Sequence, residues 1–369
     1  MCEQLKKFWT IKQNWVFESR IMNQGTNKKI LFCAFDAGGG NAVFPVVKEI
    51  IKNKKIQTQC LIGGPSREIF KRAKIKYIDA DLLNDKELNV FVTNFKPDFL
   101  VSGTSAGPTF DKKILPTLKS VRTKTMYILD YWANYWERFS GAKRDFKYLP
   151  DTICVMDKKA KQEMITDGFR SPMIKVTGNP YFDYFQKNIK SGVADTSTIL
   201  FVSQPYVGEK EKFGYDEFEA LNDILEISSD FLPGRKVIIR PHPRENKSKF
   251  DGYLDAGVTI DNKTSIEKLL SRAGLVIGMN SMVLFQAAIA GKKVISYQPN
   301  LKTKDFAVSN ELGLSKLITK KKDLKVLLQK YFHGKFPKSK KTKNIIVPHA
   351  TKNIIDIITK HYIQHGKDN

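Results

Sequence analysis

From Lys28 onward, short apolar segments alternate with longer amphipathic ones. The apolar runs have the length of buried strands, and the segments between them repeat apolar residues at helical spacing. Strands are predicted over residues 28–35, 56–62, 98–102, 124–129, 151–156 and 173–178. Helices are predicted over residues 42–53, 111–120 and 158–168. Strands that alternate with helices of about ten residues indicate parallel βαβ units.

The same alternation starts again after a polar stretch over residues 188–197. Its predicted strands cover residues 198–205, 234–243, 257–260, 274–278 and 292–297, and its predicted helices 215–229, 265–273 and 281–291. We therefore predict an α/β protein with two facing Rossmann-like domains and a central cleft. The predicted parts are an N-terminal extension (1–27), a first domain (28–187), a second domain (188–345) and a C-terminal helix (346–369).

Ligands of open α/β sheets bind beyond the carboxyl ends of the strands, so the loops that follow strands are the candidate sites. In the loop FDAGGGNA, Gly38, Gly39 and Gly40 permit positive φ and let backbone N–H groups approach a ligand. A tight strand-to-helix turn, with Asp36 as a turn residue or cap, explains the same sequence. The loop lacks the G-x-G-x-x-G pattern, which disfavours NAD binding.

Two further loops of the first domain hold candidate chemistry. Thr104 and Ser105 lie in SGTSAGP and can donate hydrogen bonds to a ligand. The segment LDYWANYWERF contains Asp130 and Glu137, which are candidate general bases together with Asp36. Its aromatic residues can stack on sugars or bases, although Trp132 and Trp136 are also spaced as one core face of a helix.

The second domain offers a cationic loop and a helix start. Arg240, His242 and Arg244 surround the two prolines of RPHPREN, a rigid arrangement that suits a diphosphate. A strand ending at Gly278 leads to Asn280 and Ser281 at the start of an apolar helix that also holds Gln286. Free N–H groups at such a helix start favour phosphate binding.

Taken in order, these motifs resemble those of GT-B glycosyltransferases. The shared features are the Gly-rich loop, VTGNPYFD (176–183), R-P-H-P, G-M-N-S and GKKVISY. The pattern is most similar to the group that holds lipid A disaccharide synthase, capsule-type transferases and non-hydrolysing UDP-N-acetylglucosamine 2-epimerase. The resemblance covers about residues 28–310.

The resemblance implies a metal-independent enzyme that needs no cofactor, takes a nucleotide-sugar on its second domain and holds the acceptor on its first. Arg240 and His242 would contact the donor phosphates, and Asn280 and Ser281 the diphosphate. Gly178 and Asn179 would line the hinge, and the last helix would cross back onto the first domain. The expected acceptor is a cell-surface glycan or a lipid-linked sugar.

An epimerase activity is the second hypothesis. VTGNPYFD and PHPREN resemble the epimerase motifs V-T-G-N-x-x-x-D and H-R-R-E-N. However, Asp130 stands where a Glu is expected, SGTSAG replaces a Gly-Asp loop, and MNSMVLFQ replaces the Glu-rich S-G-G-x-x-E-E segment. The last of these replacements removes carboxylates associated with sugar binding in the epimerase, so glycosyl transfer ranks first.

Composition adds a question about partners. The net charge is +24, and residues 315–343 contribute +10 of it, with eleven Lys and one Asp. This basic stretch favours an anionic partner, for which we expect an anionic membrane face rather than nucleic acid. A non-catalytic polyanion-binding protein is the alternative of another class, and a generally lysine-rich composition would give the same excess without any partner.

The four cysteines lie far apart, with no His at metal-ligand spacing, which argues against a zinc site and against a disulfide framework. The first 26 residues contain no apolar segment of the secretory type. We therefore expect a cytoplasmic protein, and the basic stretch suggests a peripheral position on the inner face of the membrane.

Overall fold

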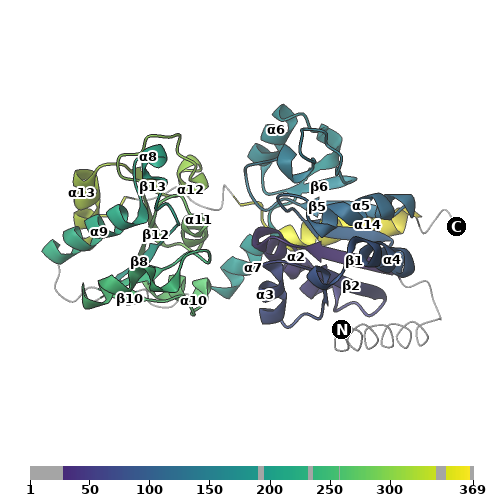
Figure 1. Cartoon of the computed structure of the whole chain (residues 1–369), viewed down its shortest axis with the longest axis horizontal. Helices are drawn as coiled ribbons and strands as arrows, with labels where there is room; N and C mark the ends of the chain where they lie inside the picture. Colours follow the sequence, from purple (N-terminus) through teal and green to yellow (C-terminus); the bar gives the residue numbers. More distant parts are fainter. Residues whose placement is uncertain (1–27, 190–194, 232–235, 257, 338–345, 366–369) are drawn as a thin grey trace.

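The computed structural model describes residues 28–189, 195–231, 236–256, 258–337 and 346–365. Two parallel β-sheets, each covered by helices, lie side by side (Figure 1). The predicted α/β architecture with two Rossmann-like halves is confirmed. The N-terminal extension, residues 1–27, lies outside the described residues.

The first sheet has the strand order β3-β2-β1-β4-β5-β6-β7, and all its pairs are parallel. Its strands are β1 (Lys28–Ala34), β2 (Ile56–Ile62), β3 (Ile78–Asp79), β4 (Phe99–Gly103), β5 (Lys124–Ile128), β6 (Thr152–Val155) and β7 (Ile174–Val176). Its helices are α2 (Ala37–Ile50), α3 (Ser66–Arg72), α4 (Asp85–Phe95), α5 (Phe110–Ser120), α6 (Lys158–Thr166) and α7 (Pro180–Asn188). Short 3₁₀ turns are η1 (Ala80–Leu82), η2 (Trp136–Arg138) and η3 (Ser171–Met173).

The second sheet has the order β10-β9-β8-β11-β12-β13, again with parallel pairs only. Its strands are β8 (Asp195–Val202), β9 (Lys236–Arg240), β10 (Val258–Ile260), β11 (Ala273–Gly278), β12 (Lys293–Tyr297) and β13 (Lys316–Ile318). Its helices are α8 (Lys210–Phe213), α9 (Glu217–Phe231), α10 (Ile266–Arg272), α11 (Met282–Ile289), α12 (Val308–Glu311) and α13 (Lys321–Phe332), with a 3₁₀ segment η4 (Lys247–Ala256).

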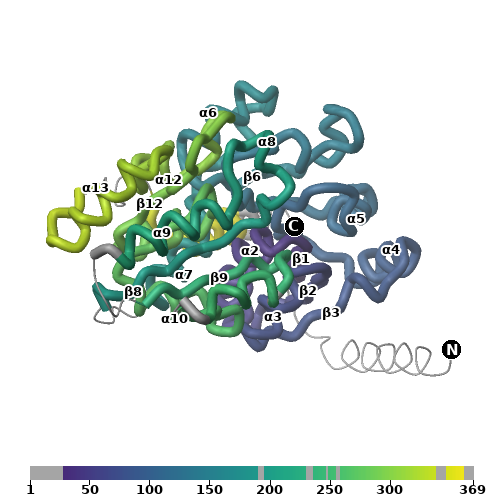
Figure 2. Tube along the Cα trace, turned by 60° about the vertical axis from the view of Figure 1, so that its left-hand side comes forward, coloured from purple at the N-terminus to yellow at the C-terminus, as the bar shows by residue number. Residues whose placement is uncertain are grey.

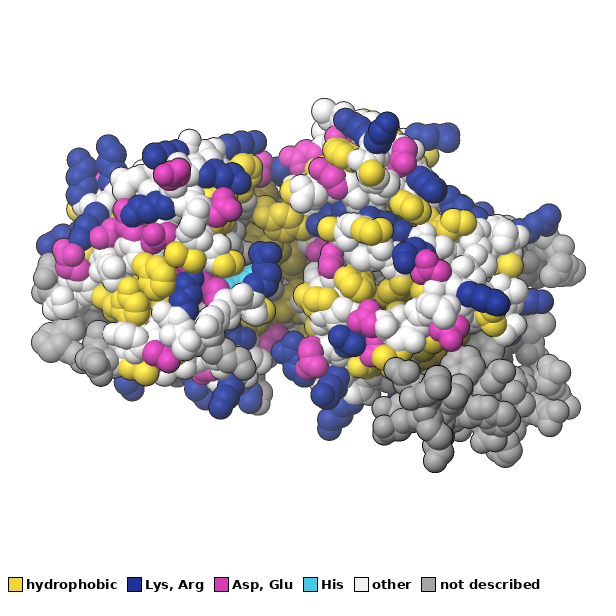
Figure 3. All heavy atoms as spheres, viewed as in Figure 1, with side chains coloured by type: hydrophobic (Ala, Val, Ile, Leu, Met, Phe, Trp, Pro, Cys, Tyr) yellow, Lys and Arg dark blue, Asp and Glu magenta, His cyan; other side chains and the backbone are white. Residues whose placement is uncertain are grey.

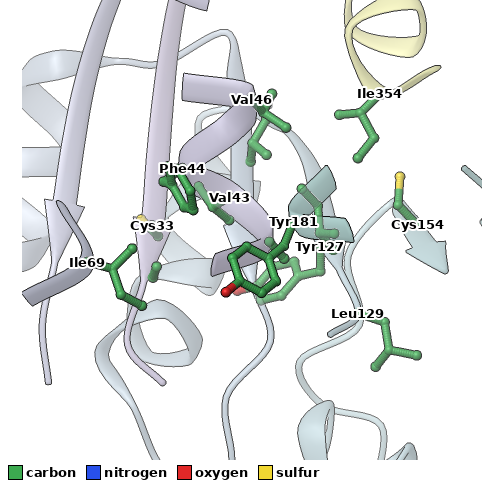
Figure 4. Close-up of a cluster of buried hydrophobic side chains, with 14 of the residues drawn as sticks. Cys33, Val43, Phe44, Val46, Ile69, Tyr127, Leu129, Cys154, Tyr181 and Ile354 are labelled. Atoms are coloured by element: carbon green, nitrogen blue, oxygen red, sulfur yellow. The ribbon is translucent and has the colours of Figure 1, made fainter. Parts of the chain in front are cut away.

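Helices on both faces explain why the central strands are apolar throughout rather than alternating. In β1, every residue from Ile30 to Ala34 is fully buried, which is typical of a parallel strand covered on both faces. Figure 4 shows part of this core, where residues of β1, α2 and β5 meet.

The last helix, α14 (Ala350–His365), returns to the first sheet and packs on α2 and α7. Its apolar residues Ile354 and Ile358 are buried in the core of the first domain (Figures 1 and 4). The helix that the sequence predicted to cross back therefore does so, and it covers one face of the first sheet.

The Gly-rich segment follows the second of its two interpretations, a tight strand-to-helix turn with Asp36 as the N-cap residue, although the helix starts earlier than predicted. Helix α2 begins at Ala37, so Gly38, Gly39 and Gly40 lie in its first turns and none of them has a positive φ. The glycines are needed for close approach instead. A Cβ on Gly39 would lie 2.8 Å from the Thr104 carbonyl oxygen, and one on Gly40 would lie 2.3 Å from Ser66 Oγ.

The basic stretch contains regular secondary structure. Its described part, residues 315–337, contains the edge strand β13 and helix α13. Leu324, Leu327, Leu328 and Tyr331 form the buried face of α13, a helical spacing that the run of lysines obscures in the sequence. Figures 1 and 2 both place α13 at the end of the second domain remote from the first. No described helix is long and apolar enough to cross a membrane.

Candidate functional site

Four polar side chains from three loops meet at the carboxyl edge of the first sheet. Asp36 follows β1, Thr104 and Ser105 follow β4, and Asp130 follows β5. The Thr104 hydroxyl donates to Asp130 Oδ1 at 2.8 Å, and the Ala106 N–H donates to Asp36 Oδ2 at 2.9 Å. The three loops that the sequence singled out in this domain therefore form one constellation.

Helix α2 is seated directly on this constellation. A Cβ on Gly38 would lie 1.7 Å from Asp130 Oδ2, so only glycine leaves room for the carboxylate there. The glycine run thus lets the start of α2, next to Asp36, approach Asp130 closely.

The two aspartates differ in how many hydrogen bonds and ion pairs they form with the rest of the protein. Asp130 Oδ1 accepts hydrogen bonds from Arg138 Nη1 at 2.7 Å and from Thr104, and the Asp130 and Arg138 side chains are 14% and 11% exposed. Among the described residues, Asp36 has no ion-pair partner, and none donates to its Oδ1. Asp36 therefore has fewer contacts with the protein than Asp130, whose Oδ1 is held by both Arg138 and Thr104.

Glu137 does not join the other two candidate bases. It lines a separate hollow of about 450 Å³ between the loop after β5 and helix α6. One of its carboxylate oxygens, Oε2, is buried and has no hydrogen-bond partner among the residues that the structure describes. Its backbone carbonyl accepts from Lys112 Nζ at 3.3 Å, and the same ammonium donates to the Gly107 carbonyl at 2.8 Å. Lys112 therefore ties the loop after β4 to the loop after β5.

Beside Lys112 lies an unpaired acid. Asp111 is 1% exposed, and no described residue forms a hydrogen bond with either of its carboxylate oxygens. Burial raises the pKa of Asp111 from 3.8 to about 6, although the nearby Thr109 hydroxyl and the Lys112 ammonium oppose the change. Close to the carboxyl edge of the first sheet there is thus one carboxyl group that titrates close to neutral pH.

At the carboxyl edge of the second sheet, Asn280 is held from two sides. Gln204 Nε2 and the Tyr206 hydroxyl both donate to Asn280 Oδ1 at 2.6 Å, and the Asn280 N–H donates to Gln204 Oε1 at 2.9 Å. Ser281 is the N-cap of α11, where its hydroxyl accepts from the Val283 N–H at 3.2 Å. The loop after Gly278 is therefore ordered by its own contacts.

The loop after β9 contains the predicted cations. Arg240 Nη1 donates to the carbonyl oxygens of Asp261 and Thr264 at 3.0 and 2.9 Å. His242 Nδ1 accepts from the Arg244 N–H at 3.2 Å, so the neutral ring has its proton on Nε2. Burial, with a smaller effect of Arg244, lowers the pKa of His242, which favours that neutral form at pH 7.

A cavity of about 380 Å³ lies between the two domains and has walls from both. Arg240, Ser265 and Gln286 line it from the second domain. Arg72 and Tyr181 are on the opposite wall, and the Tyr181 hydroxyl donates to Glu267 Oε1 at 3.5 Å. Figure 3 shows the hollow between the domains, with apolar side chains in its depth and basic ones on its rims.

Aromatic residues bring the two carboxyl edges face to face. The rings of Trp132, from the loop after β5, and Phe285, from α11, have centroids 5.2 Å apart, and Trp132 stacks on Phe182 of α7 at 5.9 Å. Burial raises the pKa of Tyr206, and Tyr131 across the cleft adds to that effect. The loop after β5 therefore contacts the second domain through Trp132.

Gly178 and Asn179 lie where the chain leaves the first sheet. Gly178 has φ +83°, and a Cβ there would lie 2.5 Å from the Val347 carbonyl oxygen. Asn179 caps α7 by accepting from the Tyr181 N–H at 2.9 Å. Asn353 of α14 donates to the neighbouring Thr177 carbonyl at 3.0 Å, so the hinge is braced by the last helix.

Sequence reasoning missed Arg138, Gln204 and Tyr206. The last two belong to SQPY, directly after β8, so the rule that selected the other loops also applies to this one. Arg138 was harder to predict. It lies eight residues after Asp130 in the sequence, and the two meet only because the loop after β5 folds back on itself. Among the described residues, no group of three or more His, Cys, Asp or Glu is placed to hold a metal ion.

No protein-family model matches the chain, and no curated protein matches it by sequence. The structure is similar to that of UDP-GlcNAc 2-epimerase from Methanocaldococcus jannaschii, with a TM-score of 0.67 and 16% identity over 90% of this chain and 99% of that chain. It is also similar to UDP-GlcNAc 2-epimerase from Neisseria meningitidis bound to UDP-GlcNAc, with a TM-score of 0.65 and 16% identity over 90% of this chain and 100% of that chain.

A third similar structure is that of the lipopolysaccharide outer core galactosyltransferase WaaB. Its TM-score is 0.52 and its identity 12%, over 90% of this chain and 99% of that chain. Because these likenesses extend over both domains at low identity, they establish the fold. The chain therefore has the two-domain GT-B-type fold of these epimerases and of this galactosyltransferase.

Proposed function

We propose that the protein is a glycosyltransferase that moves a sugar from a nucleotide-sugar to an acceptor hydroxyl. The observation that supports this most directly is the division of groups across the cleft. The first domain presents the Asp36 carboxylate, whose Oδ1 accepts no hydrogen bond from a described residue. The second presents His242, Arg244 and the start of α11, all of which suit a departing phosphate.

In the proposed reaction, the acceptor oxygen bonds to the anomeric carbon of the sugar while the bond from that carbon to the phosphate oxygen breaks. Asp36 takes the proton of the acceptor hydroxyl. The nucleoside diphosphate leaves with the electron pair of the broken bond. Its charge is stabilised by His242 Nε2–H, by the Arg244 guanidinium and by the first N–H groups of α11.

The acceptor in this proposal is a glycan or a lipid-linked sugar bound on the first domain. An anionic membrane face is the proposed partner of the basic stretch. The lysines of α13 lie at the far end of the second domain, so a membrane contact there would leave the cleft open to the side. A long, flexible acceptor fits that arrangement better than a short one embedded in the bilayer.

The experiment is acceptor-dependent release of nucleoside diphosphate from a panel of nucleotide-sugars, for the wild type and for Asp36→Asn. Loss of a general base lowers turnover by about 10²–10⁴-fold. Nucleotide affinity should stay unchanged, because Asp36 lies on the other domain. Full activity of Asp36→Asn would assign the proton acceptor elsewhere, and absence of release with every donor would reject the transferase.

A second candidate function is 2-epimerisation of a UDP-amino sugar, because two of the similar solved structures reported above are UDP-GlcNAc 2-epimerases. Inversion at C2 removes and replaces the hydrogen on that carbon, whereas transfer leaves it in place. UDP-GlcNAc is therefore incubated with the protein in D₂O without acceptor and followed by NMR. Deuterium at C2 identifies an epimerase, and an unchanged C2 hydrogen with acceptor-dependent UDP release identifies a transferase.

A further inference from the structure

A buried cluster of three charges lies directly behind the loops that we propose to bind the donor. Glu217, at the start of α9, has a fully buried side chain, and the side chains of Glu245 and Lys249 are 1% and 11% exposed. Lys249 Nζ lies 2.7 Å from Glu245 Oε1 and forms a second ion pair with Glu217. One ammonium thus joins two buried carboxylates that come from different segments of the chain.

Each carboxylate accepts a hydrogen bond from a backbone N–H group of one donor loop. Glu245 Oε2 accepts from the His242 N–H at 2.5 Å, and its Oε1 also accepts from the Ser203 hydroxyl at 2.8 Å. Glu217 Oε2 accepts from the Tyr206 N–H at 2.9 Å. The loop after β8 and the loop after β9 are therefore linked to each other through Lys249.

The contacts continue to the third loop. Tyr206, fixed by Glu217 at its backbone, uses its hydroxyl to hold Asn280 before α11. The whole donor side of the cleft, from His242 to Asn280, is therefore connected through the pair of carboxylates that Lys249 bridges.

The cluster depends on its single cation. Removing one partner of a buried ion pair leaves an uncompensated buried charge, and here it would leave two adjacent carboxylates. Burial already raises the pKa of Glu245, which indicates that this carboxylate has little access to water. The lysine is held in place by the rings of Phe218 and Phe250, whose centroids lie 5.0 and 5.3 Å from Nζ.

We propose that Lys249 is a positioning residue, whose ammonium sets the relative geometry of the 203–206 and 240–244 loops by bridging Glu217 and Glu245. It touches no ligand in this proposal and acts only through the two carboxylates. The inference rests on the proposed function in one respect, namely that these loops bind the nucleotide part of the donor.

The test is amide hydrogen exchange of the intact protein, followed by mass spectrometry. Lys249→Met should speed exchange by about tenfold or more in peptides covering 203–209 and 240–246, because the His242 and Tyr206 N–H groups lose fixed acceptors. Lys249→Arg, which can still pair with both carboxylates, should restore most of the protection. Lys321→Met is the matched control. That lysine also bridges two carboxylates of this domain, Asp223 at 2.9 Å and Glu226 at 2.6 Å, but it is 42% exposed and both its partners belong to α9 rather than to the two loops.

The double variant Glu217→Gln/Lys249→Met distinguishes loss of the ion pairs made by Lys249 from a change in the net charge of the cluster. It keeps the net charge of the cluster at −1, so it decides the question even if Lys249→Met does not fold. Faster exchange confined to the two loops supports the proposal. Wild-type exchange in those loops, or an equal increase throughout the second domain, would overturn it, because Lys249 would then act only on general stability.

Nucleotide binding by calorimetry is the second readout, measured on folded protein well below its melting temperature. The proposal expects weaker binding for Lys249→Met and for the double variant, with Lys321→Met unchanged. If the wild type binds no nucleotide, the proposed function fails, while the exchange experiment still decides the role of Lys249.

Discussion

Asp111 provides the sharpest test of the electrostatics near the carboxyl edge of the first sheet. Its carboxyl group is buried with no hydrogen bond from the part of the chain that the structure describes, and burial raises its pKa from 3.8 to about 6. A group whose pKa is raised on folding binds its proton more tightly in the folded state. The wild type therefore loses stability as the pH rises from about 4 through 6, and the full penalty is present above pH 6.

The size of the effect follows from the same values. One pKa unit corresponds to about 1.4 kcal/mol, so a change from 3.8 to about 6 gives a penalty of about 3 kcal/mol at neutral pH. Asp111→Asn has nearly the same shape and never ionises. Its free energy of unfolding should match the wild type within about 1 kcal/mol at pH 4 and exceed it by about 3 kcal/mol at pH 7.5.

The assay is urea unfolding of both proteins at several values between pH 4 and 8. Groups other than Asp111 titrate in both proteins, so they cancel in the difference. Asp195→Asn is a control of opposite sign. Hydrogen bonds from the Ser197 and Thr198 hydroxyls lower the pKa of Asp195 to about 2, so this variant should be the less stable one at neutral pH and approach the wild type in acid. A stability difference for Asp111→Asn that does not change with pH would refute the reasoning.

Three further outcomes are expected. Gly38→Ala should lower the free energy of unfolding by about 1–3 kcal/mol in urea titration, because the added Cβ meets Asp130; an unchanged midpoint would show that the carboxylate moves freely. Trp132→Ala should cost about 3–5 kcal/mol through loss of the aromatic stack between the domains, measured by calorimetry, and a cost below 1 kcal/mol would contradict that role. If the basic face of α13 meets a membrane, replacing the exposed Lys322 and Lys330 by Gln should weaken flotation with anionic vesicles at low salt and leave neutral vesicles unaffected. Equal flotation of variant and wild type would exclude α13 as the contact.

How far the fold could be predicted depends on the length of each element. Strands such as β1 and β11 are continuous apolar runs between turn residues, a pattern that buried parallel strands produce by themselves. The edge strand β3 has two residues and no pattern of its own, since it exists only because β2 offers it a partner. The same holds for β13. It has three residues, lies in a lysine-rich stretch and pairs with β12 at the edge of the sheet, so its sequence shows no strand pattern.

For the candidate site, the sequence located the loops but not the pairing of their side chains. The rule that ligands bind after strands selected Asp36, Asp130, His242 and Asn280, and each does lie at a carboxyl edge. It says nothing about contacts between residues far apart in the chain. Gln204 reaches Asn280 across 76 positions, a contact that only the parallel pairing of β8 with β11 creates.

Those pairings change which groups remain available to a ligand. The Arg240 guanidinium is bound to two carbonyl oxygens, the Asn280 carbonyl oxygen accepts from two side chains, and the Ser281 hydroxyl caps its own helix. A ligand in the cleft would therefore meet His242 Nε2–H, Arg244 and backbone N–H groups on one side, and Asp36 on the other. The Arg240, Asn280 and Ser281 side chains thus already hold these loops in shape. It follows that binding should depend more on the positions of these loops than on any one side chain, which is why Lys249, remote from the cleft surface, is the residue whose replacement should be most informative.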